Sequence, residues 1–165
     1  MSEEPTIVER SAAPYAAIKV LVTMDELGAV VPPLNSEVFQ WLASHGLAPV
    51  GAPFWKYNLI DMQGDLEIEA GVAVAEPVSG DDRVLGGVLP RGRYVTTRHL
   101  GHPNALMPAT AALLDWAAGH GLTWDKTDTP DGERWGARLE LYLTDPREEP
   151  DMNKWVTELA FRLAD

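Results

Sequence analysis

The chain contains two segments that read almost as copies of each other, and this internal repeat limits the folds available to it. Residues 33–47 and 108–122 align at a constant spacing of 75 residues, with Pro, Trp, Ala, His, Gly and Leu coinciding. The whole chain has only six Trp and four His, so the match is improbable by chance. It indicates a duplicated unit, and two such units usually pack with pseudo-twofold symmetry. The seam between the halves is then the natural place for a cleft.

Hydrophobic periodicity predicts the same order of elements in each half. In the first half, about residues 5–76, we expect a strand at 14–23, a helix ending at Gly46, and strands at 54–60 and 66–74. In the second half, about residues 88–165, we expect a strand at 94–99, a helix that starts at Pro103 or Pro108 and ends at Gly121, and strands at 135–144 and 155–163. Residues 76–82 and 85–87 read as linker. The predicted fold class is α+β: a duplicated strand-helix-strand-strand module in one domain, residues 1–165, with an antiparallel sheet and two helices on one face.

Composition excludes several classes of function. The chain has 165 residues and is 45% hydrophobic, which suffices for one good core. Its net charge of −12 would repel a phosphate backbone, so direct nucleic-acid binding is not expected. There is no cysteine, no signal-peptide pattern at the start and no apolar run of membrane-spanning length. We therefore expect a cytoplasmic protein that does not associate with membranes.

Alternation along residues 135–143 separates two faces of one strand. The odd positions are all apolar and are expected to face the helices. The even positions, which include Arg138, Glu140 and Tyr142, are then expected to point away from the helices, toward water or toward a cleft. On alternation alone, Arg138 and Glu140 read as an ordinary charge pair on the wet side of the sheet.

Aromatic residues on several strands favour the cleft over the wet surface. The candidate walls around Glu140 are Trp55, Tyr57, Tyr94, Tyr142 and Trp155. A carboxylate inside an aromatic box attracts lipophilic cations by coulombic and cation–π forces. Desolvation also raises the pKa of such an acid, which suits it for proton transfer.

Three motifs resemble the GyrI-like small-molecule-binding domains. The closing run at residues 135–146, followed by 155–161, looks like the end of that family's pattern, and residues 94–101 are similar to its entry into the second helix. The resemblance implies a central ligand cleft like that of the effector domains of AraC- and MerR-type multidrug regulators. In that family an acidic residue sits among aromatics on the penultimate strand, a place that falls here on Glu140. No DNA-binding module precedes the first strand, so the chain looks like a free-standing relative.

Other chemical motifs are weaker. His99 and His102 offer two imidazoles without a third ligand at metal-site spacing, so neither a metal nor another cofactor is expected. His45 and His120 occupy matching helix ends, where they are expected to bind free carbonyls. No Gly-x-Ser-x-Gly elbow is present, so a serine hydrolase mechanism has no support.

Three functions remain open from the sequence. The first is a binding protein for a lipophilic, cationic or drug-like molecule, with Glu140 as the counter-charge. The second, which the resemblance implies, is a hydrolase of strained, cyclopropane-containing xenobiotics that uses the same Glu140 as its catalytic acid or base. The third is a protein partner, such as gyrase, approached by the acidic surface.

Overall fold

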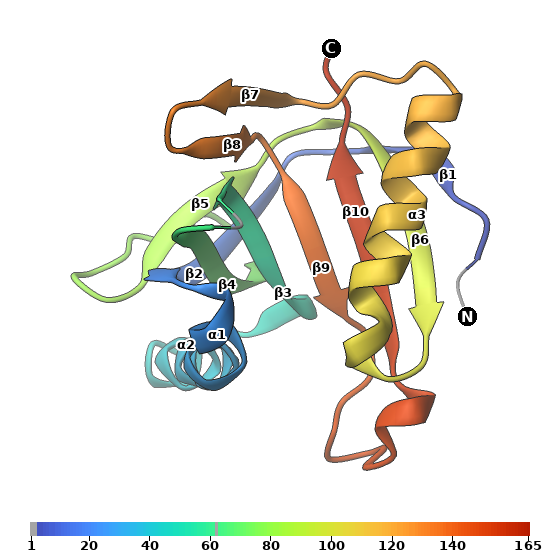
Figure 1. Cartoon of the computed structure of the whole chain (residues 1–165). Coiled ribbons are helices and arrows are strands. Elements are labelled where there is room, and N and C mark those ends of the chain that lie inside the picture. The colour runs from blue at the N-terminus through green and yellow to red at the C-terminus, as the bar shows by residue number, and fades with distance from the viewer. Residues whose placement is uncertain (1–2, 62) are drawn as a thin grey trace.

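A computed structural model describes residues 3–61 and 63–165, and its strands join into one antiparallel sheet (Figure 1). The strands of the main path, in spatial order, are β1 (Thr6–Arg10), β6 (Gly92–Leu100), β10 (Val156–Arg162), β9 (Arg138–Tyr142), β3 (Pro49–Ile60), β4 (Leu66–Val74), β2 (Ala13–Val22) and β5 (Leu85–Leu89). A hairpin of β7 (Lys126–Thr129) and β8 (Gly132–Trp135) joins the sheet through β3.

This strand order is pseudo-symmetric about the seam between β9 and β3. Trp55 of β3 pairs with Glu140 of β9. One strand outward on either side, Trp55 pairs with Ala70 of β4, and Glu140 pairs with Leu159 of β10. Rotation about the seam therefore exchanges Trp55 with Glu140 and, two residues further along each strand, Tyr57 with Tyr142. The duplicated module predicted from the repeat is confirmed.

The helices lie on one face of the sheet (Figure 1). They are α1 (Met24–Val30), α2 (Pro32–Ser44) and α3 (Leu106–Gly119), with short 3-10 turns η1 (Pro103–Ala105) before α3 and η2 (Met152–Lys154) before β10. The faces of α2 and α3 that carry Leu34, Val38 and Leu42, and Leu106, Ala109 and Leu113, are buried against the sheet. This burial of one apolar stripe stabilises each helix.

The C-termini of α2 and α3 show the expected capping. In each, a histidine Nδ1 lies 2.8 Å from a tryptophan carbonyl four residues earlier, His45 on Trp41 and His120 on Trp116. Gly46 and Gly121 follow with φ of 69° and 67°, the left-handed conformation that ends a helix.

Both faces of the sheet are buried, which corrects the predicted orientation of β9. The larger core lies between the sheet and the helices and includes Leu159 and Phe161. A smaller core on the opposite face includes Tyr94, Ala137 and Leu139. The odd positions of β9 therefore face away from the helices. Glu140 pairs with Leu159, so the even positions lie on the helix face.

The predicted orientation of β9 was wrong for two physical reasons. Apolar residues cover both faces of this sheet, so alternation alone does not identify the helix side. The chain also breaks its strand geometry between β8 and β9, at residues 136–137. Trp135 consequently belongs to the larger core and Ala137 to the smaller one, although both are odd positions.

Several elements were not predicted. The edge strands β1 and β5 are short, and α1 and the β7–β8 hairpin carry little hydrophobic periodicity. The segment that contains Gly86 and Gly87 is part of β5, not a linker. A Cβ at Gly87 would lie 2.6 Å from the hydroxyl of Tyr15, so the glycine lets this edge strand pack against that ring.

Candidate functional site

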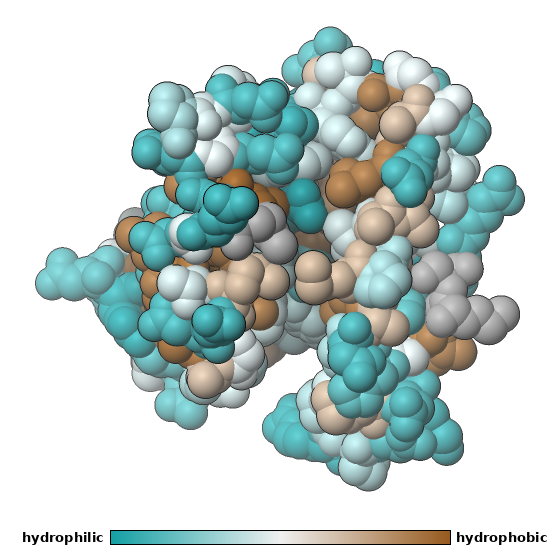
Figure 2. Space-filling view, viewed as in Figure 1, coloured by the Kyte–Doolittle hydropathy of each residue, from teal (hydrophilic) through white to brown (hydrophobic). Residues whose placement is uncertain are grey.

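Five side chains of β3 and β9 gather at the pseudo-twofold seam on the helix face. We call them the central cluster: Trp55, Tyr57, Arg138, Glu140 and Tyr142. All five are half-buried, so they are shielded by protein yet remain in contact with solvent. In Figure 2 the surface is hollowed between the lobe of α1 and α2 and the lobe of α3, the region under which β3 and β9 run.

Two tyrosines hold the carboxylate of Glu140. The Tyr57 hydroxyl donates to Oε1 at 3.0 Å, and the Tyr142 hydroxyl donates to the same oxygen at 2.8 Å. Within residues 3–61 and 63–165, the second oxygen, Oε2, accepts no hydrogen bond from a side chain or backbone group. One oxygen is therefore used to fix the carboxylate, and the other remains available.

Trp55 forms a wall of the cluster next to Tyr142. Their ring centroids lie 5.2 Å apart in an edge-to-face arrangement with an interplanar angle of 72°. The indole N–H of Trp55 donates to Oδ1 of Asn35 on α2 at 2.8 Å. The amide of Asn35 also donates to the carbonyl oxygens of Phe54 at 3.2 Å and Gly71 at 3.3 Å. Asn35 thus fixes the indole and ties α2 to the sheet.

Arg138 brings a positive charge into the cluster. Its guanidinium carbon lies 4.8 Å from the ring centroid of Trp135 and 4.6 Å from that of Phe161, within cation–π range. In the part of the chain that the structure describes, Arg138 and Glu140 have no nitrogen–oxygen pair within 4.0 Å. The ordinary charge pair considered from the sequence is therefore not formed.

Burial dominates the electrostatics of the cluster. Desolvation raises the pKa of Glu140, although the two tyrosine hydroxyls and the charge of Arg138 act to lower it. Burial and the neighbouring carboxylate hold the pKa values of Tyr57 and Tyr142 well above their usual range. Both phenols consequently stay protonated at neutral pH and can donate to Glu140.

The structure brings four of the six predicted site residues together and leaves two outside. Trp55, Tyr57, Glu140 and Tyr142 belong to the central cluster. Tyr94 does not, because it is 1% exposed in the smaller core on the opposite face, where its hydroxyl donates to the Pro90 carbonyl. The prediction that Tyr94 lines the same wall is wrong.

Trp155 lies outside the central cluster, immediately before β10. It follows η2 and is half-buried, two residues before Thr157, which pairs with Tyr142. Its indole N–H donates to the carbonyl of Glu149 at 2.6 Å. This bond fixes the loop that precedes β10, and within the described residues Trp155 makes no hydrogen bond or ring contact with the central cluster.

Sequence reasoning missed Asn35 and gave Arg138 no role in the site. Asn35 carries no motif, and the corresponding position of the repeat is Thr110, so the duplication gave no signal for it. Arg138 was recognised as an even position of the strand that carries Glu140, but only the structure shows the two rings that hold it away from Glu140.

A second buried polar cluster lies on the opposite face of the sheet. Glu69, 4% exposed, accepts hydrogen bonds from Tyr15 at 2.6 Å and from Asn58 and Lys56. Its two oxygens are both occupied by donors, and desolvation with the nearby carboxylate raises the pKa of Tyr15 far above its usual value. This saturated network reads as a structural feature of the smaller core.

The surface also has a concavity beside the C-terminus of α2. It is lined mainly by apolar groups, among them Trp41, Leu47, Val50, Val74 and Pro77. The ring of His45 at its rim already binds the Trp41 carbonyl. Because the lining of this concavity is mainly apolar, whereas the central cluster joins a carboxylate to aromatic rings, we place the candidate site at the central cluster.

Two further chemical features bear on function. Among residues 3–61 and 63–165, no group of three His, Cys, Asp or Glu side chains is placed to hold a metal ion. Within the same residues, no helix is both long and apolar enough to cross a membrane.

Comparison with known proteins assigns nearly the whole chain to one family model. The model described as the GyrI-like small molecule binding domain matches residues 3–164. No curated protein sequence matches.

Solved structures share the fold at low sequence identity. The EcmrR C-terminal domain is 19% identical with a TM-score of 0.74, and the match covers 98% of each chain. The EcmrR chain in a complex with DNA is also 19% identical, with a TM-score of 0.76, but the match spans only 57% of its length against 98% of this chain.

Two other structures carry descriptions of a ligand or an activity. SAV2435 bound to tetraphenylphosphonium is 12% identical with a TM-score of 0.63, and the match covers 98% of this chain and 94% of that one. A hydrolase from Listeria innocua is 15% identical with a TM-score of 0.62, and the match covers 98% and 92%. At such identities these likenesses establish the fold alone.

Proposed function

Because the chain belongs to the GyrI-like small-molecule-binding family, we propose that the central cluster binds a lipophilic molecule through a cationic group, with Glu140 as the counter-charge. The observation that carries the proposal is the carboxylate itself. It is fixed through Oε1 by two tyrosine hydroxyls, while Oε2 accepts no hydrogen bond from the described residues.

The surroundings of Glu140 support a cationic and aromatic ligand. Trp55 and Tyr142 offer ring surfaces on which an apolar molecule can pack, and their faces attract positive charge. Low solvent content strengthens the attraction between a carboxylate and a bound cation. The structure of SAV2435 with tetraphenylphosphonium shows that this fold can hold a lipophilic cation in another protein.

A titration with tetraphenylphosphonium tests the proposal, followed by tryptophan fluorescence because Trp55 lies in the cluster. We expect saturable quenching by the wild-type protein and a loss of affinity of about tenfold or more in Glu140→Gln, the equivalent of 1.4 kcal/mol. Glu9→Gln is the matched control, because Glu9 is an exposed glutamate on β1 of the same sheet. Unchanged affinity in Glu140→Gln would overturn the proposal.

A hydrolase is the second candidate, and the raised pKa of Glu140 favours it. An acid that keeps its proton closer to neutral pH can protonate a strained ring or a leaving group. Incubation with a cyclopropane-containing genotoxin, followed by chromatography, tests this function. A ring-opened product formed by the wild type and absent with Glu140→Gln would support it, whereas recovery of intact compound from both would reject it for this substrate class.

A further inference from the structure

Arg138 is a second charged group of the central cluster, and it is held in an unusual way. Its guanidinium stacks on Trp135 and Phe161 at 4.8 Å and 4.6 Å from the ring centroids. The two rings hold the guanidinium in place, but ring faces do not use its five N–H donors. Arg138 is half-buried, so these donors still reach the surface of the site.

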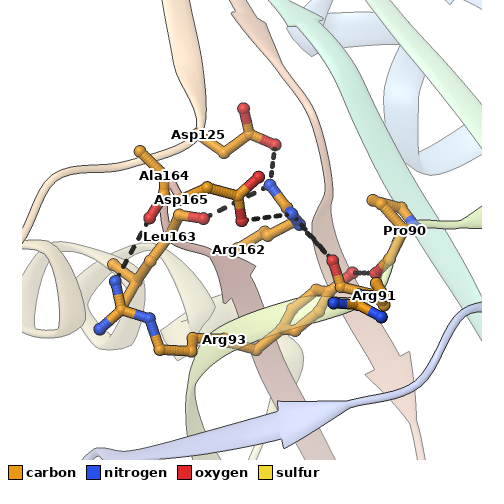
Figure 3. A network of polar contacts seen from close by, with 9 residues as sticks. Pro90, Arg91, Arg93, Asp125, Arg162, Leu163, Ala164 and Asp165 are labelled. Atoms are coloured by element: carbon orange, nitrogen blue, oxygen red, sulfur yellow. Dashed lines mark hydrogen bonds and ion pairs between the residues drawn. The ribbon is translucent and has the colours of Figure 1, made fainter.

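The donors of Arg138 have no acceptor in the described part of the chain. Among residues 3–61 and 63–165, no hydrogen bond or ion pair within 4.0 Å involves its guanidinium. Arg162 on the neighbouring strand β10 shows the contrast (Figure 3). Its guanidinium bonds to Asp125 at 2.9 Å, to Asp165 at 3.0 Å and to the Arg91 carbonyl at 2.8 Å. The guanidinium of Arg162 thus has acceptors for its donors, whereas that of Arg138 has none among the described residues.

Glu140 and Arg138 stay apart although they lie on the same face of one strand. Positions two residues apart in a strand are about 7 Å apart, a span that the two long side chains could close. They do not close it, because two tyrosines hold the carboxylate and two rings hold the guanidinium. Within the described residues, the site therefore presents one free acceptor, Oε2 of Glu140, and one free set of donors, on Arg138, on the same face of β9.

We propose that the ligand of the central cluster is an aromatic zwitterion, whose cationic group meets Glu140 and whose carboxylate meets Arg138. This inference rests on the proposed function and narrows its ligand class. A ligand with only a positive charge, such as tetraphenylphosphonium, would bind more weakly than a zwitterion, because Arg138 repels it and its donors lose water without gaining an acceptor. A carboxylate accepts two parallel hydrogen bonds from a guanidinium, which satisfies those donors.

Rhodamine B and its ethyl ester form a matched pair of probes. Both carry the same cationic aromatic ring system, but only rhodamine B has a free carboxylate. We expect fluorescence anisotropy titrations of the wild-type protein to show rhodamine B binding about tenfold or more tightly than the ester. Equal binding, or tighter binding of the ester, would overturn the inference and leave the proposed function intact.

Variants of Arg138 give the second arm of the experiment. Arg138→Gln is expected to weaken rhodamine B and to strengthen the ester, since the favourable and the repulsive interactions disappear together. A purely structural role would weaken both probes equally, which would also overturn the inference. Arg138→Lys keeps the charge without the planar fork and is expected to retain part of the preference. Failure of both probes to bind the wild type would count against the proposed function itself.

Discussion

Replacing Glu140 by Gln is expected to stabilise the free protein at neutral pH while it weakens ligand binding. Glutamine has nearly the same shape and keeps an oxygen that can accept from Tyr57 and Tyr142. What the substitution removes is a charge that the fold has partly taken out of water. The pKa of Glu140 is raised despite two hydrogen bonds and a nearby arginine, so desolvation outweighs their combined effect.

The magnitude and the pH dependence follow from linkage. A glutamate whose pKa is higher in the folded protein stabilises the fold most at low pH, and this stabilisation is lost as the pH rises through the folded pKa. Each unit by which the pKa is raised corresponds to about 1.36 kcal/mol, so the gain in stability of E140Q at pH 7 measures how far the fold raises the pKa of Glu140. For a chain of this length, each 1 kcal/mol of added stability raises Tm by about 2–4 °C.

Thermal and urea denaturation of wild type, E140Q and the control E9Q between pH 4 and 8 would measure the effect. The gain of E140Q over the wild type should be largest at neutral pH and should shrink as the pH falls and Glu140 takes up its proton. A variant that is less stable at pH 7, or a difference that does not change with pH, would refute the reasoning. The same data show whether any loss of binding in E140Q comes from unfolding.

Three further outcomes are expected. Tyr142→Phe removes the 2.8 Å hydrogen bond to Glu140, so the pKa of that carboxyl should rise further and the pH at which cation binding is half lost should move upward, as titrations at several pH values would show. Asn35→Ala removes three hydrogen bonds and should cost about 1–3 kcal/mol in urea denaturation, with Thr110→Ala at the corresponding repeat position costing less. Leu159→Ala should cost about 2–5 kcal/mol, because this side chain is fully buried in the larger core; a loss below 1 kcal/mol would show that the core relaxes around it.

The repeat and the hydrophobic periodicity predicted the elements that carry large buried faces. Strands β2, β4, β6 and β10 and helices α2 and α3 lie close to their predicted ranges. The edge strands β1 and β5 escaped prediction because each has five residues and several exposed positions, which gives periodicity little to detect. Long buried elements show a hydrophobic periodicity that can be recognised in the sequence, whereas short edge strands form because a neighbouring strand pairs with them.

The sequence predicted the acidic residue of the candidate site and some of the residues around it. Family resemblance identified Glu140, strand alternation grouped Tyr142 with it, and the aromatic content of the strands suggested Tyr57; these three side chains do lie together. The prediction for Tyr94 was wrong because aromatic residues are buried on both faces of the sheet, so the presence of an aromatic residue on a strand does not indicate which face it occupies. Asn35 lies in the helix directly before β3, 20 residues from Trp55, and tertiary packing of α2 on the sheet brings its amide to the indole of Trp55.

The pseudo-twofold axis has a consequence for how a ligand is oriented. If the site had identical residues on both sides of the axis, a ligand could bind in two equivalent poses related by rotation. Here the axis exchanges the indole of Trp55 with the carboxylate of Glu140, while the hydroxyls of Tyr57 and Tyr142, which the axis also exchanges, both point to the acid. The backbone is pseudo-symmetric, but the side chains on the two sides of the axis differ, so we expect a bound molecule to have one preferred direction along the seam.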